Sequence, residues 1–299
     1  MGNMAIYYKD LKSKLKKGLE FIYPNWTSES LDKYKTGSNV VVVYNNVTKS
    51  DVKDIRRYIR DDCKVYIEGH NLIEDITSVI DLFSNAELSN ITFVLERFYQ
   101  HEIGTYNTGS KVFKYTYFPY SLVQAKIDLK DYDYKKDRPF QKFDYVGSTK
   151  FNSSIRDRLY HRGIYKKLKV INEPDIDIYS KAKVVLLPDV DKISLETWYA
   201  IAAGTPFVNV NSYPHFSRDL GTHLMGGTPH FLQFKTDINP SELGEIEKVS
   251  YMKNLYENSD HPHVLSTSLT DRDLFFTSSL EDSVGRLFTR FLFANKYLL

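Results

Sequence analysis

The chain has 299 residues, of which 42% are hydrophobic and 26% are charged, so it has enough apolar material for two domains of ordinary size. Its formal net charge of +2 is too small to indicate nucleic-acid binding by itself, because such binding depends on local clusters of Lys and Arg. The single cysteine, Cys63, excludes an internal disulfide, and no apolar stretch approaches the roughly 20 residues that cross a bilayer. We therefore expect a cytoplasmic protein without a membrane partner.

Strands and helices alternate through the first 125 residues. Residues 6–17 have the spacing of a Lys-rich amphipathic helix, and residues 40–44 are a β-branched run that suits a buried parallel strand. Further elements are predicted as a helix at 51–60, a strand at 64–67, a helix at 73–83, a strand at 91–95 and an apolar segment at 115–119. The following residues 126–140 are charged, Tyr-rich and poorly periodic, which predicts a linker.

The alternation resumes at residue 141. Predicted elements are strands at 143–148, 168–171 and 184–187, helices at 153–162 and 176–182, a helix that begins after Ser194, and a strand after residue 206. Downstream elements are predicted as a strand at 231–234, helices at 240–247 and 251–257, and a terminal helix at 280–297. Because such alternation produces parallel sheets with right-handed crossovers, the sequence predicts two facing, doubly wound α/β domains with the ligand in the cleft between them.

Two strand-to-helix connections in the second half are suited to anion binding. The turn at 147–150 supplies small residues, with Lys150, Arg156 and Arg158 in reach of a diphosphate. A turn of this kind is about as often a purely structural connection as a binding site. Ser194 is placed to cap the later helix, whose first N–H groups point at any anion in the crevice. The residues of this candidate anion site are Gly147, Ser148, Lys150, Arg156 and Ser194.

No motif indicates a dehydrogenase, a structural zinc site or a serine hydrolase, because G-x-G-x-x-G, metal-ligand Cys/His spacing and G-x-S-x-G are all absent. Asp-x-Asp pairs occur at 131–133, 175–177 and 189–191, but three copies in an Asp-rich chain favour chance, and we predict no metal site. As general base we favour Glu68 and next His70, which follow the strand at 64–67. Either residue is equally consistent with a helix cap or a solvent-facing side chain.

Three ordered segments resemble the DNA β-glucosyltransferases of T-even bacteriophages, which have the GT-B fold. They are residues 115–119 with 126–132, residues 143–148, and residues 193–195 with Trp198 and Ala202. The resemblance implies a GT-B enzyme with two Rossmann-like domains, an acceptor-side domain at 1–125 and a nucleotide-sugar domain at 141–279. The last residues, 280–299, are expected to pack back on the first domain.

The resemblance also implies an activity, which is the inverting transfer of glucose from UDP-glucose to a hydroxymethyl group on a base of double-stranded DNA. The base is flipped out of the stack for this reaction, and no covalent sugar intermediate or metal ion is implied. UDP-glucose and modified duplex DNA are therefore the expected partners of a monomeric enzyme. The aspartate base of the family follows a strand equivalent to residues 64–67, so Glu68 or His70 is expected to replace it.

The family's donor site transfers to this sequence with two departures. Its two diphosphate-binding arginines fall on Lys150 and Arg156, the latter with a two-residue shift. The position of its ribose-binding glutamate is occupied by Tyr199, and the position of an arginine three residues earlier is occupied by Glu196. We expect Glu196 to bind the ribose instead, one helical turn from the usual place. The expected donor-site residues are Gly147, Ser148, Lys150, Arg156, Glu173, Asp175, Ser194, Glu196 and Tyr199, where Glu173 and Asp175 resemble the segment whose backbone meets the uracil.

Two other functions fit the same sequence. One is a GT-B glycosyltransferase with a small molecule, lipid or protein as acceptor, and the other is a nucleotide-sugar- or DNA-binding module without turnover. The altered donor helix and the missing aspartate permit the second. The basic clusters at 9–17, 53–60 and 156–167 do not decide between them, because each is most simply a solvated helix face.

Overall fold

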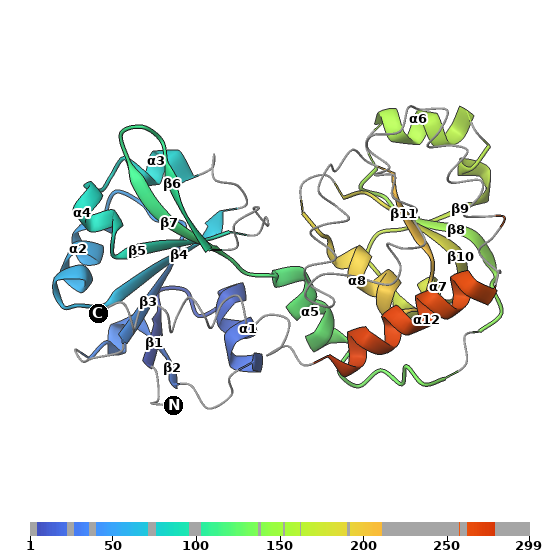
Figure 1. Ribbon diagram of the computed structural model, residues 1–299, viewed down its shortest axis with the longest axis horizontal. Coiled ribbons are helices and arrows are strands. Elements are labelled where there is room, and N and C mark those ends of the chain that lie inside the picture. The colour runs from blue at the N-terminus through green and yellow to red at the C-terminus, as the bar shows by residue number, and fades with distance from the viewer. Residues whose placement is uncertain are drawn as a thin grey trace. The chain divides into compact units, whose positions relative to one another are not determined.

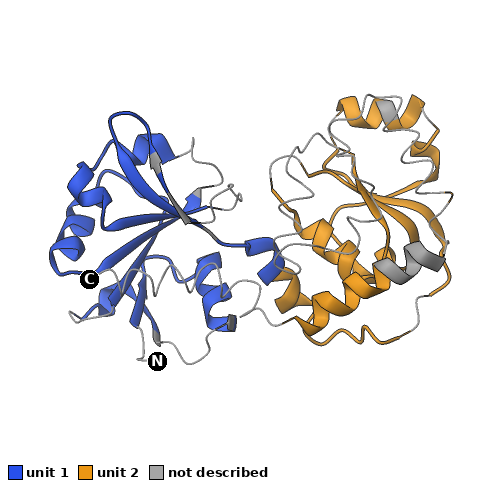
Figure 2. Cartoon of the chain, viewed as in Figure 1, with its two compact units in different colours: residues 1–123, 280–299 blue, residues 124–279 orange. Residues whose placement is uncertain are grey.

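The structure is a computed structural model, and its described residues are 5–22, 27–35, 40–70, 76–95, 103–136, 139–151, 153–161, 163–189, 192–210, 257 and 262–278. The chain divides into two compact units, one formed by residues 1–123 with 280–299 and the other by residues 124–279 (Figure 2). Each unit contains one β-sheet, and the two are described separately. Among the described residues, no helix has the length and apolar character needed to cross a membrane.

The sheet of unit 1 has seven strands in the order β2-β1-β3-β4-β5-β7-β6 (Figure 1). The strands are β1 (Ala5–Tyr8), β2 (Thr27–Ser30), β3 (Val40–Asn45), β4 (Lys64–His70), β5 (Ile91–Leu95), β6 (Ile103–Asn107) and β7 (Val112–Tyr117). All neighbours run parallel except β6, which is antiparallel to β7. The hairpin partner β6 was not predicted, because a short edge strand carries little apolar periodicity.

Helices cover both faces of this sheet. They are α1 (Lys14–Ile22), α2 (Val52–Arg60), α3 (Thr77–Ile80) and α4 (Asn85–Leu88). Val42 and Tyr44 of β3 belong to the same buried cluster as Ile55 and Tyr58 of α2. The alternate strand residues point to the other face, where α1 packs so closely that a Cβ on Gly18 would lie 2.6 Å from the Phe118 ring.

The prediction of one helix over residues 6–17 is wrong. Residues Ile6, Tyr7 and Tyr8 belong to β1 and are buried between β2 and β3. The helix α1 begins only at Lys14, after a turn. The Lys-rich helical pattern is that of α1. The three large residues before it, Ile6, Tyr7 and Tyr8, also fit helical spacing, but their burial in the sheet is the larger stabilisation.

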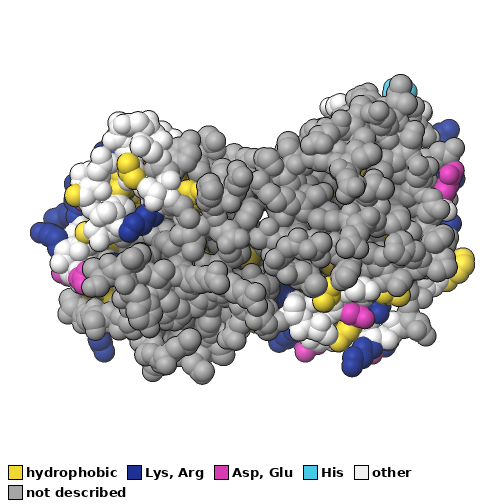
Figure 3. Space-filling view, in the orientation of Figure 1, with side chains coloured by type: hydrophobic (Ala, Val, Ile, Leu, Met, Phe, Trp, Pro, Cys, Tyr) yellow, Lys and Arg dark blue, Asp and Glu magenta, His cyan; other side chains and the backbone are white. Residues whose placement is uncertain are grey.

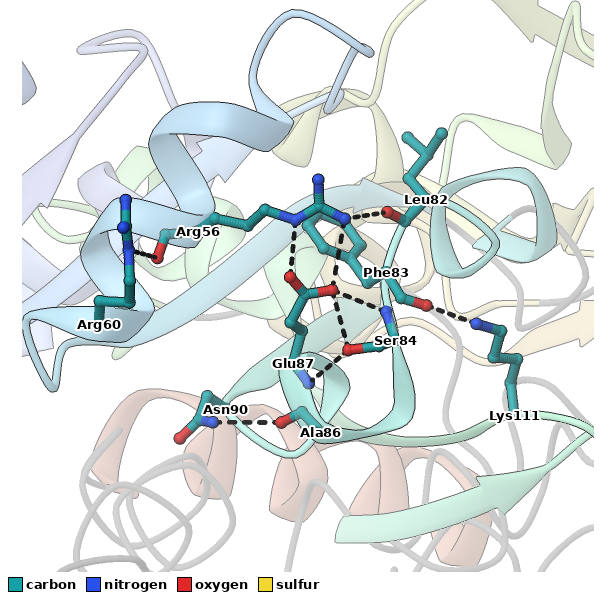
Figure 4. Close-up of polar contacts among 9 residues, drawn as sticks. All are labelled: Arg56, Arg60, Leu82, Phe83, Ser84, Ala86, Glu87, Asn90 and Lys111. Atoms are coloured by element: carbon teal, nitrogen blue, oxygen red, sulfur yellow. Dashed lines mark hydrogen bonds and ion pairs between the residues drawn. The ribbon is translucent and has the colours of Figure 1, made fainter.

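The predicted helix at 73–83 is short where it is described, since α3 covers only Thr77–Ile80. A separate helix, α4, begins with a capping box in which Ser84 Oγ accepts from the Glu87 N–H at 3.3 Å and the Glu87 carboxylate accepts from the Ser84 N–H at 2.7 Å. Glu87 also accepts from Arg56 Nε at 2.6 Å, which ties α4 to α2 (Figure 4). Lys111 Nζ donates to the Phe83 carbonyl in the same network (Figure 4).

The sheet of unit 2 has four parallel strands in the order β11-β10-β8-β9. Its elements are α5 (Tyr120–Asp128), β8 (Phe143–Ser148), α6 (Ser153–His161), β9 (Leu168–Ile171), α7 (Ile176–Ser180), β10 (Ala182–Leu187), α8 (Leu195–Ala202), β11 (Phe207–Asn209) and α12 (Pro262–Thr277), of which α5 begins in unit 1. The predicted strands and helices between 143 and 209 are confirmed, except that α7 ends at Ser180 and Ala182, predicted as its end, begins β10. The helix α12 was not predicted, and α5 extends to Asp128, inside the stretch predicted as linker. The predictions at 231–234, 240–247 and 280–297, and at 251–257 apart from residue 257, lie outside the described residues.

Helices also cover both faces of the second sheet, with α6 on one side and α7, α8 and α12 on the other (Figure 1). On the α6 side, Ile155 and Leu159 pack with Val184 and Leu186. On the other side Trp198 of α8 is 1% exposed, and its ring stacks on Phe275 of α12 with centroids 6.4 Å apart. Two α/β units with parallel sheets are the components of the predicted GT-B class, so the fold class is confirmed by the structure of each unit.

Candidate functional site

The strand order of unit 2 places a switch point between β8 and β10. The chain moves from β8 to β9 on one side and then returns to β10 and β11 on the other. Ligands of parallel α/β sheets bind at such a point, outside the carboxyl ends of the strands. Ser148 ends β8 and Asp189 follows the end of β10, so both predicted connections begin at this place.

The turn after β8 has a structural reason for its sequence. A Cβ on Gly147 would lie 2.7 Å from the Phe151 ring, so only glycine lets this ring pack against the strand end. Ser148 is buried, and its Oγ accepts from the Lys150 N–H at 3.1 Å. The turn therefore leads to Lys150, whose side chain is 59% exposed.

The start of α8 is built as the sequence predicts. Ser194 is the N-cap, and its Oγ accepts from the Thr197 N–H at 3.3 Å. Glu196 lies in the first turn, where a carboxylate is favourable beside the positive end of the helix dipole. Its side chain is only 4% exposed, and its Oε1 forms an ion pair with Lys150 Nζ. The structure thus brings together two residues that the sequence placed 46 positions apart.

Asp189 bonds to the same start of α8, and the sequence indicated it only as part of an Asp-x-Asp pattern. Its Oδ2 accepts from the Ser194 N–H at 3.1 Å and from Thr197 Oγ1 at 2.7 Å. Its backbone carbonyl accepts from Asn209 Nδ2, at the end of β11, at 2.9 Å. Burial raises the pKa of the Asp189 carboxyl to about 6, although the hydrogen bonds from Ser194 and Thr197 act in the opposite direction.

The remaining predicted donor residues have other surroundings. The Tyr199 hydroxyl donates to Asp128 Oδ2 of α5 at 3.2 Å, and burial first, then Asp128, raise the pKa of Tyr199 to about 12. Asp175 is the N-cap of α7, where it accepts from two backbone N–H groups. Arg156 and Glu173 are exposed, and within the described ranges no hydrogen bond or ion pair links either residue to the Lys150–Glu196 pair. The Asp128 contact had no signal in the sequence, because its segment was predicted to be a linker.

In unit 1, Glu68 lies near the carboxyl end of β4 and is 2% exposed. Its Oε2 accepts from the Leu15 N–H at 3.2 Å, in the first turn of α1, and from the Tyr120 hydroxyl at 3.1 Å. Its Oε1 is buried and has no hydrogen-bond partner in the described part of the chain. Burial, as the largest cause, raises the pKa of the Glu68 carboxyl. His70 ends β4, and its side chain is not among those described.

Of the structural alternatives predicted for Glu68, the solvent-facing side chain is wrong because the residue is buried, and the helix that it caps is α1 and not the next helix in the chain. The bond from Leu15 is that of a cap on α1, which precedes Glu68 in the chain. A buried carboxyl with a raised pKa and one unpartnered oxygen is also the form that a general base takes. The next residue, Gly69, has φ +96, and a Cβ there would lie 2.5 Å from Asn45 Oδ1, so this strand end accepts only glycine at that position.

The chain also contains Asp-x-Asp pairs and basic clusters. Among the residues that the structure describes, no three His, Cys, Asp or Glu side chains are grouped as metal ligands. The cationic side chains of α2 are exposed and gather over that helix (Figure 3); they are Lys53, Arg56, Arg57 and Arg60. The pairing of Arg56 with Glu87 fits the interpretation of this cluster as a solvated helix face.

No protein-family model matches the chain, and no curated protein matches it. Solved structures similar to it include two that match over almost the whole length of both chains. The OtsA apo structure shares 8% identity over 97% of this chain and 99% of its own, with a TM-score of 0.49. An α,α-trehalose 6-phosphate synthase from Burkholderia multivorans shares 8% identity over 100% of both chains, with a TM-score of 0.45. At these values of identity and TM-score, neither likeness bears on the function.

Proposed function

We propose that the protein is a UDP-sugar-dependent glycosyltransferase of the GT-B class that binds its donor at the switch point of unit 2. The observation that carries this proposal is the position of the Lys150–Glu196 pair. The pair joins the turn after β8 to the first turn of α8. These two segments follow the strands on either side of the switch point, where parallel α/β sheets bind ligands. A cation, a carboxylate and a helix N-terminus at one place match a diphosphate and a ribose.

In this proposal the donor changes the partners of the pair. Without nucleotide, Lys150 and Glu196 neutralise each other. With UDP bound, Lys150 and the start of α8 contact the diphosphate, Arg156 adds a second cation, and the Glu196 carboxylate accepts hydrogen bonds from the ribose hydroxyls. The buried position of Glu196 supports this role, because its carboxylate is held in one place before the nucleotide arrives.

We propose glucose as the sugar and a hydroxymethylated base of double-stranded DNA as the acceptor, on the strength of the sequence resemblance. The acceptor oxygen attacks the anomeric carbon and forms the new bond as the bond from that carbon to UDP breaks. The Glu68 carboxylate takes the acceptor proton, and the negative charge that develops on UDP is stabilised by Lys150 and Arg156. A single displacement of this kind inverts the anomeric configuration.

Isothermal titration calorimetry with UDP tests the donor site. We expect Lys150→Ala and Glu196→Gln each to weaken binding by about 1 to 3 kcal/mol, the scale for a charged hydrogen bond left unmade. Lys166→Ala is the matched control, because Lys166 is also exposed in unit 2 but lies after α6 and not at the switch point. UDP affinity that is unchanged in both site variants, or equally reduced in the control, contradicts the assignment.

Incubation with labelled UDP-glucose and duplex DNA that contains hydroxymethylated pyrimidines tests the reaction and its acceptor. Mass analysis of the nucleosides should show one added hexose, and DNA binding should weaken steeply with salt. A specific observation supports the alternative of a binding module without turnover, since Glu68 already accepts two hydrogen bonds in a structural position. Tight UDP binding without transfer to any acceptor would establish that alternative.

A further inference from the structure

Asp189 connects three elements of unit 2. It follows β10, its carboxylate accepts hydrogen bonds from Ser194 and Thr197 at the start of α8, and its carbonyl accepts from Asn209 at the end of β11. The Ser194–Thr197 capping bond closes the network. The beginning of α8 is therefore fixed to the carboxyl edge of the sheet by bonds that converge on one carboxylate.

We infer that Asp189 is a positioning residue of the donor site, which holds the first turn of α8 so that Glu196 meets Lys150. This inference rests on the proposed function, because it concerns the same site. Glu196 lies two residues after the Ser194 cap and one residue before Thr197. A carboxylate that fixes both of these neighbours also fixes the backbone that carries Glu196.

Stability alone does not explain an aspartate at this position. The side chain is 3% exposed, and its Oδ1 has no hydrogen-bond partner within the described ranges. The charged group that faces it among the described residues is Glu196 of α8, whose carboxylate makes ionisation of Asp189 less favourable. A buried carboxylate with one unpartnered oxygen and an acidic neighbour is costly, which points to a use beyond stability.

UDP titrations on four variants test the inference. We expect Asp189→Ala and Thr197→Val each to raise the Kd for UDP about tenfold, the effect of about one lost hydrogen bond to a charged group. Asp189→Asn keeps an acceptor oxygen for Ser194 and Thr197, so it should stay within about threefold of the wild type. Thr205→Val is the matched control, because it removes a buried hydrogen bond of 2.8 Å, from Thr205 to the Tyr179 carbonyl, just beyond the other end of α8. It should lower the melting temperature and leave the Kd unchanged.

A double-mutant cycle shows whether Asp189 acts through Glu196. In a Glu196→Gln background, Asp189→Ala should change the Kd by less than about threefold, because the side chain that it positions has already been altered. An undiminished tenfold effect in that background, or a wild-type Kd for both Asp189→Ala and Thr197→Val, would overturn the inference.

Hydrogen exchange of the ligand-free protein provides a test that needs no nucleotide. The hydrogen-bonded amides of Ser194 and Thr197 should exchange at least about tenfold faster in Thr197→Val and Asp189→Ala than in the wild type, and not in Thr205→Val. Unchanged exchange there rejects the positioning role even if UDP binds. A wild-type protein that fails to bind UDP but shows this exchange pattern rejects the proposed function and leaves the structural role of Asp189 intact.

Discussion

Asp189 makes the stability of unit 2 depend on pH. Burial raises the pKa of its carboxyl from 3.8 to about 6 in the folded chain. Because the folded state holds the proton more tightly than the unfolded state, the carboxyl stabilises the fold at pH values below 3.8 and loses this contribution as the pH rises through about 6. A difference of about two pKa units corresponds to about 3 kcal/mol for a group that is shielded from solvent.

The comparison of wild type with Asp189→Asn isolates this effect. We expect the unfolding free energy of the wild type, relative to that of the variant, to fall by about 2.5 kcal/mol between about pH 4 and about pH 7.5. Any constant difference in packing or hydrogen bonding cancels in this comparison. Urea unfolding followed by the fluorescence of Trp198 reports on unit 2, provided that Trp26→Phe is present in both proteins to remove the second tryptophan.

Asp157→Asn is the control, because Asp157 is exposed on α6. Its unfolding free energy should track that of the wild type across the whole pH range. If the difference between the wild type and Asp189→Asn is the same at both ends of the range, the Asp189 carboxyl is not desolvated in the folded protein. The reasoning from its burial would then be refuted.

Three further changes test other parts of the molecule. Glu68→Gln keeps an acceptor for Leu15 and Tyr120, so calorimetry should show normal UDP binding while sugar transfer is abolished; normal turnover would place the base elsewhere. Gly147→Ala should lower the unfolding free energy by about 1 to 3 kcal/mol, since the new methyl group lies 2.7 Å from a ring, and an unchanged urea midpoint would contradict this contact. Glu87→Ala should cost about 1 kcal/mol in the same assay, mostly from the lost capping box. Glu20→Ala, which removes a partly buried ion pair with Lys16 within α1 but no helix cap, should cost less.

Several local features of the fold are readable from the sequence. The run at 40–44 is apolar at every position, which only a strand covered on both faces satisfies, and it is β3 in the structure. Ser194 before an apolar helical pattern predicts the N-cap of α8, which the structure confirms. The prediction of one helix at 6–17 was wrong because apolar residues next to lysines fit a helical pattern by spacing alone. Its first part is a strand only because β2 and β3, which come later in the chain, pair with it.

What the sequence determined by itself is the order of strands and helices between residues 143 and 209, the turn at Gly147 and the cap at Ser194. These depend on backbone geometry and burial within a few neighbouring residues, so local residue types specify them. Only the tertiary structure decided that Lys150 pairs with Glu196, that Asp189 fixes the start of α8, and that Tyr199 bonds to Asp128. Such pairs join segments that the chain brings together through its strand order, and no local pattern encodes which strand ends become neighbours.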